Sequence, residues 1–159
     1  MLIDSFQPEG ITRLAVDSIF MMPHLGVLST VDEQAATEVF ERDCLIYLGT
    51  CVAPVGSGKV GEVCAQYTVD LPSGRQVGEL RVGELVLLPL ADDDEVEIEL
   101  KPARRWDMGA GFGQALSARV CGGVVGLVLD GRGRPIQIVE DDRLGQVSAW
   151  QRALNLYGE

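Results

Sequence analysis

The sequence has little of what nucleic-acid-binding and membrane proteins depend on. It carries 13 Lys and Arg against 24 Asp and Glu, a formal net charge of -11, so the average field repels polyanions and we expect no nucleic-acid partner. No apolar run approaches the ~20 residues that cross a bilayer. Asp4 and Glu9 stand where a signal peptide would carry positive charge. We therefore expect a soluble, cytoplasmic protein that does not associate with a membrane.

Histidine and paired cysteines are also scarce, which argues against a metal site. Four cysteines lie in apolar segments without a CxxC pair: Cys44, Cys51, Cys64 and Cys121. We expect buried free thiols and no metal. His24 is the single imidazole, and no Ser, Cys or carboxylate pattern accompanies it, so we interpret it as a structural hydrogen-bonding residue and not as a base. No catalytic residue and no cofactor are predicted.

What is present is the composition of one globular domain. Hydrophobic residues make up 47% and charged residues 23% of the 159 positions, the balance of an ordinary folded chain. We expect a single domain over residues 1–159. Its parts are a helical N-terminal part (1–43), a β-rich core (44–140) and a C-terminal helix (141–159).

Two helices are predicted in the N-terminal part. Four apolar positions fall on one side of a 3.6-residue repeat: Leu14, Ala15, Ile19 and Met22. They predict a short helix over 14–22 that Pro23 interrupts. Thr30 stands three places before Glu33, the spacing of a capping box, and predicts a second helix that ends near Asp43.

Beyond residue 43 the apolar period changes to two. Residues 63–71 alternate and are followed by the turn sequence Pro72-Ser73-Gly74, which predicts a hairpin. In 95–100, three glutamates alternate with three apolar residues, so the carboxylates are expected on the solvent face of one strand. Further strands are predicted at 44–53, 84–90, 116–121 and 124–130. The last is almost entirely apolar, so we expect it to be covered on both faces.

These elements predict the fold class. A closing helix is indicated by apolar residues at helical spacing: Leu144, Val147, Trp150 and Leu154. The chain is therefore expected to be α+β and strand-rich, with N-terminal helices, a small antiparallel β-barrel or sandwich, and a C-terminal helix.

The segment 101–113 is the first candidate site. Glycine recurs at every second position from Gly109, and Gly109 and Gly111 would let backbone amides approach a bound anion. Arg104 would add positive charge beside Asp107. Because the segment lacks both the Lys-Ser/Thr ending of a P-loop and GxGxxG spacing, we favour a wide glycine bend between two strands.

The segment 122–135 is the second candidate site. Asp130 begins a turn in which Arg132 and Arg134 alternate with glycine, which places two guanidinium groups at a loop tip. Such a tip could clamp a carboxylate or phosphate. Alternatively, both arginines form ion pairs with acidic groups of the same protein.

Several ordered motifs resemble one known family. They are Pro23-His24-Leu25-Gly26-Val27-Leu28, Asp43-Cys44-Leu45-Ile46 with Gly49-Thr50 and Ala53-Pro54-Val55-Gly56, Asp107-Met108-Gly109-Ala110-Gly111, and the run from Gly122 to Pro135. Over nearly its whole length the chain resembles the C-terminal region of the MutL-type accessory proteins of glutamate (methylaspartate) mutase. Full-length members look like an actin/Hsp70-type nucleotide-binding region followed by such a C-terminal region, and they are associated with assembly or reactivation of adenosylcobalamin-dependent mutases. The resemblance carries over no catalytic residue.

The sequence supports three hypotheses of function. The first is a non-enzymatic accessory domain that binds a protein, either a cobalamin-dependent mutase subunit or a nucleotide-binding region of the same family. The second is a small-molecule or anion-binding barrel, which could be an enzyme, built around the candidate residues of the two glycine-rich segments. The third is a homodimerising scaffold.

Overall fold

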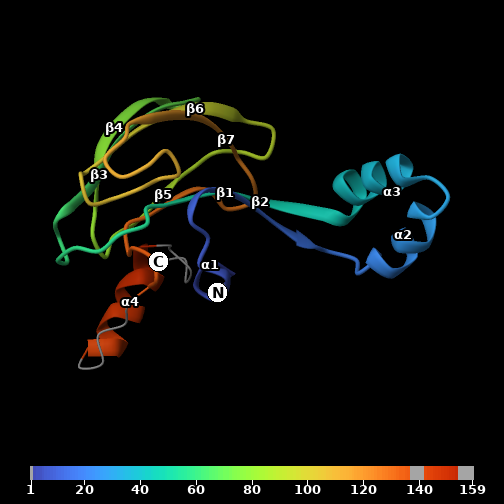
Figure 1. Cartoon of the computed structure of the whole chain (residues 1–159), viewed down its shortest axis with the longest axis horizontal. Coiled ribbons are helices and arrows are strands. Elements are labelled where there is room, and N and C mark those ends of the chain that lie inside the picture. Colours follow the sequence, from blue (N-terminus) through green and yellow to red (C-terminus); the bar gives the residue numbers. More distant parts are fainter. Residues whose placement is uncertain (1, 137–141, 154–159) are drawn as a thin grey trace.

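In the computed structural model, which describes residues 2–136 and 142–153, eight strands form two four-stranded sheets (Figure 1). The first sheet has the order β1-β2-β8-β5 and the second the order β4-β3-β6-β7. The strands are β1 (Gly10–Asp17), β2 (Leu45–Ala53), β3 (Val63–Leu71), β4 (Gly74–Arg81), β5 (Leu85–Leu88), β6 (Glu95–Pro102), β7 (Leu116–Cys121) and β8 (Gly126–Asp130). The sheets do not close into a barrel, so the β-rich core is a sandwich. Among these strands, β2 and β8 pair in parallel while the other pairs are antiparallel, which departs from the all-antiparallel expectation.

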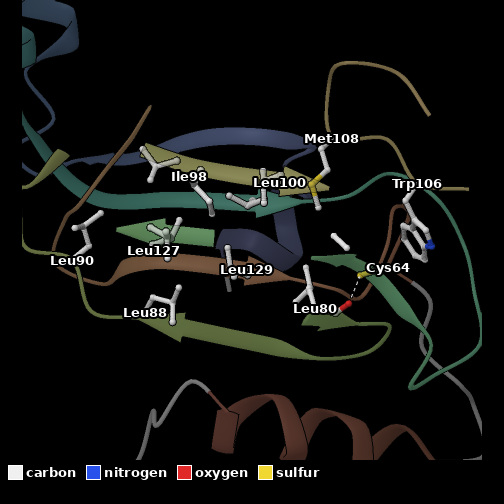
Figure 2. Packing of buried hydrophobic residues seen from close by; sticks show 14 of the residues in the cluster. Cys64, Leu80, Leu88, Leu90, Ile98, Leu100, Trp106, Met108, Leu127 and Leu129 are labelled. Atoms are coloured by element: carbon white, nitrogen blue, oxygen red, sulfur yellow. Dashed lines mark hydrogen bonds between the residues drawn. The ribbon is translucent and has the colours of Figure 1, made fainter. Parts of the chain in front are cut away.

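The hydrophobic core lies between the two sheets (Figure 2). The first sheet contributes Leu88, Leu127 and Leu129, and the second contributes Leu80, Ile98 and Leu100, together with smaller residues. Trp106 and Met108, from the loop between β6 and β7, lie at one end of the layer and are buried as well. The core therefore holds both sheets and the 103–113 loop in fixed positions.

Most strand predictions are confirmed. The 63–71 run and its turn form the β3–β4 hairpin. In β6 the three glutamates are exposed while Ile98 and Leu100 are buried, as the alternation predicts. All five residues of β8 are buried, because a central strand between β2 and β5 has both faces covered.

The predicted helix over 14–22 is wrong. Residues 10–17 form β1, which pairs antiparallel with β2 and has a register shift between Leu14 and Ala15. A short apolar run cannot distinguish helix from strand by spacing alone, and here the long-range pairing with β2 supplies the backbone hydrogen bonds. Pro23 begins a helix instead of ending one: it lies in the first turn of α2 (Met22–Ser29), where its missing N–H is not needed.

The second helix is confirmed, with a different cap. It is α3 (Glu33–Val39), and the Asp32 carboxylate, not Thr30, accepts a hydrogen bond from the Ala35 N–H at 2.9 Å. One π-helical turn, η1 (Phe40–Cys44), leads from α3 into β2.

Two helices, one at each end, complete the described chain. α1 (Leu2–Phe6) precedes β1, and α4 (Arg143–Ala153) confirms the predicted closing helix, with Leu154 outside the described residues. Trp150 of α4 donates a hydrogen bond from its indole N–H to the Gly83 carbonyl, at 3.3 Å. α4 therefore lies beside β5, and Figure 1 shows it on the side of the first sheet away from the second sheet.

Candidate functional site

The 130–135 turn forms a buried ion cluster. Asp130 is completely buried, and its two carboxylate oxygens accept hydrogen bonds from Nε and Nη2 of Arg132, both at 2.8 Å, and from Nη2 of Arg134 at 2.9 Å. Arg134 also donates to the Pro8 and Gly133 carbonyls. Both arginines are therefore held by groups of their own chain, and Arg134 has almost no contact with solvent.

Arg132 has a second carboxylate partner. Its Nη1 donates to Asp4 at 2.7 Å, and its guanidinium lies 4.6 Å from the centre of the Trp150 ring. Burial alone would lower the pKa of Arg132, but hydrogen bonds and charge from Asp130, followed by those from Asp4, outweigh burial and raise that pKa. Arg132 is thus a permanent cation beneath α4.

Asp107 organises the 103–113 loop. The Asp107 carboxylate accepts hydrogen bonds from the Gly109 N–H at 2.7 Å and the Gly111 N–H at 2.8 Å. Both glycines have φ near +108°, which residues with a Cβ rarely adopt. Because Asp107 already occupies these amides, they are not available to an incoming phosphate. Arg104 is exposed, and within the described residues it has no ion-pair partner.

The two glycine-rich segments lie on either side of Val55-Gly56. Val55 pairs with Asp107, and Gly56 pairs with Arg134. A Cβ added at Gly133 would come within 2.8 Å of the Gly56 carbonyl oxygen. The structure thus brings Asp130, Arg132 and Arg134 into one cluster. Asp107, Gly109 and Gly111 instead form a separate turn.

A helical arm, defined as residues 18–44, connects β1 to β2 (Figure 1). α2 and α3 pack mainly on each other and project beyond the end of the two sheets. At its base the Ser18 N–H and hydroxyl both donate to the Cys44 carbonyl. Within the arm only Leu25, Ala36 and Cys44 are buried. Three buried positions are few for a pair of helices, so the arm leaves much of its apolar surface uncovered.

The exposed apolar residues of the arm were missed as a site by reasoning from the sequence. The five most exposed are Ile19, Phe20, Met22, Val27 and Val31. Phe20 is 82% exposed and Val31 is 85% exposed. Asp17 accepts hydrogen bonds from the N–H groups of Ile19 and Phe20, and Phe20 sits at a φ of +54°, which is rare for a bulky residue. The available signal is the apolar stretch on both sides of Pro23, of which the spacing predicts only the part before Pro23 as a short helix.

The charged residues of the arm and its base are almost all acidic. Residues 17–44 contain six carboxylates, which are Asp17, Asp32, Glu33, Glu38, Glu41 and Asp43. Arg42 is the one Lys or Arg in this segment, and it pairs with Asp43. The arm therefore presents apolar side chains within a negative field.

Within the described residues, the thiols and the candidate metal ligands form no further site. Cys44, Cys51 and Cys64 are buried free thiols, as predicted, while Cys121 is half-buried. Across residues 2–136 and 142–153, no group of three His, Cys, Asp or Glu side chains could hold a metal ion. No helix in the described part of the chain has the length and apolar character needed to span a membrane. Comparisons with family models, with curated proteins and with solved structures found no match for this chain.

Proposed function

We propose that this chain is a non-enzymatic accessory domain that binds another protein through its helical arm. The observation that carries the proposal is the exposure of five apolar side chains on a projecting element. Large exposed apolar patches on soluble proteins often mark sites of protein–protein interaction. The 130–135 cluster, by contrast, consists of paired charges that stabilise the domain.

The apolar effect is large enough to offset the cost of association. Full burial of one such side chain contributes ~1.5–3 kcal/mol. Five of them together are comparable with the ~4–15 kcal/mol that association costs in lost translational and rotational freedom. The strained φ of Phe20 fits this role, since it holds a large aromatic group outward at the start of the arm.

The charge of the arm favours a partner with a basic rim around an apolar site. Six carboxylates lie in the same 17–44 segment as the exposed apolar residues, and like charges would oppose the pairing of two arms. The resemblance to the glutamate mutase accessory family suggests the partner class, a subunit of an adenosylcobalamin-dependent mutase or the nucleotide-binding region of that family. Either would place the domain in the cytoplasm.

The test is a pull-down with purified partners. Immobilised chain is incubated with the subunits of an adenosylcobalamin-dependent glutamate mutase and, separately, with an ATP-loaded nucleotide-binding region of the same family. We expect one of them to bind and the Phe20→Ser variant to lose most of that binding. Phe112→Ser is the matched control, because Phe112 is an exposed aromatic on the 103–113 loop.

A second variant separates the arm from the sandwich. Because the Ser18 N–H donates to the Cys44 carbonyl next to the Asp17–Leu45 pair, residues 19–43 can be replaced by an Asn-Gly turn without changing the β1–β2 register. This variant should keep its strand content and bind neither partner. Failure of both partners to bind the intact chain, or equal binding by the intact and armless chains, would refute the proposal. A stable dimer by light scattering that persists in the armless variant would favour the homodimeric scaffold.

A further inference from the structure

A cavity of about 720 Å³ lies on the outer side of the first sheet, beneath α1 and α4. All four strands of that sheet contribute to its floor, for example through Leu14, Leu48, Leu85 and Val128. Trp150 of α4 closes one side. Small-molecule sites usually have volumes of ~300–1,000 Å³ and mainly apolar walls with a few polar groups. The cavity is separate from the helical arm and from the 103–113 loop.

Among the described residues, the charged lining of the cavity consists of Arg132 and Asp4. The Arg132 side chain is 4% exposed and the Asp4 side chain 54% exposed. Asp130 binds Nε and Nη2 of Arg132 from below, which leaves Nη1 for Asp4 at 2.7 Å. A ligand could therefore replace Asp4 on Arg132 without disturbing the buried hydrogen bonds between Arg132 and Asp130.

We propose that the cavity binds a small apolar carboxylic acid, whose carboxylate takes the place of Asp4 on Nη1 of Arg132. The exchange of one carboxylate for another keeps the charge around Arg132 balanced. The Asp4 side chain can move aside because it is already half exposed, while Gln7 and Pro8 keep their own hydrogen bonds to Ile136 and Arg134. The apolar body of the ligand then covers Leu14, Leu48 and Val125.

The charge arrangement discriminates against other head groups. A cationic head would lie beside a guanidinium that is already stacked 4.6 Å from Trp150. A neutral alcohol gains nothing from displacing Asp4, so it would rely on apolar contact alone. The carboxylate form should bind most tightly among ligands of equal chain length.

The test compares decanoate, decanol and decylammonium by isothermal titration calorimetry, below their micelle-forming concentrations. We expect decanoate to bind about tenfold or more tightly than either of the others, the ratio given by ~1.4 kcal/mol. Val125→Trp, which fills the cavity, should abolish binding. Val124→Trp is the matched control, since Val124 is the adjacent exposed residue and does not line the cavity.

Asp4→Asn gives a result that simple apolar binding would not produce. Removal of the competing carboxylate should tighten decanoate binding about threefold or more, because Nη1 of Arg132 no longer has an anionic competitor. Decanol affinity should not change, which shows that the cavity remains intact. The proposal is overturned if the three probes bind equally, if none binds, if Asp4→Asn weakens decanoate binding, or if Val124→Trp and Val125→Trp have the same effect.

Discussion

Replacement of Asp130 by asparagine removes the one charge that Arg132 and Arg134 share inside the domain. The Asp130 carboxylate accepts three side-chain hydrogen bonds at 2.8–2.9 Å and one from the Arg132 N–H at 3.1 Å. The substitution turns one carboxylate oxygen into an NH2 group, which would face guanidinium N–H donors. Removal of one partner from a buried ion pair costs ~3–5 kcal/mol, since the other charge is left buried and uncompensated.

That cost should be visible in equilibrium unfolding. For a domain of this size 1 kcal/mol shifts the melting temperature by roughly 2–4 °C, so we expect a decrease of roughly 10 °C. The free energy of unfolding is measured by urea titration with far-UV circular dichroism. The matched control is Asp93→Asn, an exposed carboxylate, which should stay within ~0.5 kcal/mol of the parent chain.

A double-mutant cycle tests whether the cost comes from the ion pair itself. Arg134→Met removes one of the two guanidinium groups and leaves an apolar side chain of similar length. In combination with Asp130→Asn it should cost less than the two single changes added together, by ~1–3 kcal/mol. Additive effects, or a loss below ~1 kcal/mol for Asp130→Asn alone, would refute the reasoning.

Two further predictions concern thiols and glycines. Three thiols are buried, those of Cys44, Cys51 and Cys64. Burial raises the pKa of Cys51 and Cys64 to about 12. The Cys51 and Cys64 thiols therefore ionise near pH 9 only in the unfolded chain. Their contribution to the free energy of unfolding is fully present below pH 9, and it declines by ~1.4 kcal/mol per pH unit for each of these two thiols between pH 9 and 12. Urea midpoints against pH check this, and Cys51→Val should flatten the decline. Native chain at pH 8 should expose at most the Cys121 thiol to a disulfide reagent, and rapid reaction of all four would contradict the burial. A Cβ at Gly49 would lie 1.9 Å from the Gly126 carbonyl oxygen, at a φ of +122°, so Gly49→Ala should destabilise the chain by ~3 kcal/mol or more. Gly26→Ala, in α2 with open space around it, should instead stabilise it by ~0.5–1 kcal/mol; equal effects of the two substitutions would be inconsistent with the structure.

The β-rich half of the fold could be predicted from the sequence because its pattern is local. In β6 each glutamate faces water and each apolar neighbour faces the core, so the alternation alone identifies the strand. β1 could not be identified in this way. Its apolar positions also fit a helix, and its strand conformation depends on hydrogen bonds to β2, a strand that lies beyond the whole helical arm in the sequence.

The candidate site, too, could be predicted only in part from the sequence. The sequence points to Asp130, Arg132 and Arg134 together, but it leaves open whether the arginines bind a ligand or acidic groups of their own chain. The structure places both on Asp130. The helical arm could not be predicted as a binding surface, because Phe20 and Val31 look like core residues until the β1–β2 pairing shows that their segment projects from the sandwich.

Residues 2–8 belong to neither sheet, yet the 132–136 segment holds them firmly. Arg132 binds Asp4, Arg134 binds the Pro8 carbonyl, and the Ile136 N–H donates to the Gln7 side chain at 2.8 Å. A pulling force applied at the amino end would therefore act on these contacts before it reached the first backbone pairing of β1 with β2. A pull on the helical arm would instead pass directly into β1 and β2, so the two ends of β1 should differ in how readily force unravels the domain.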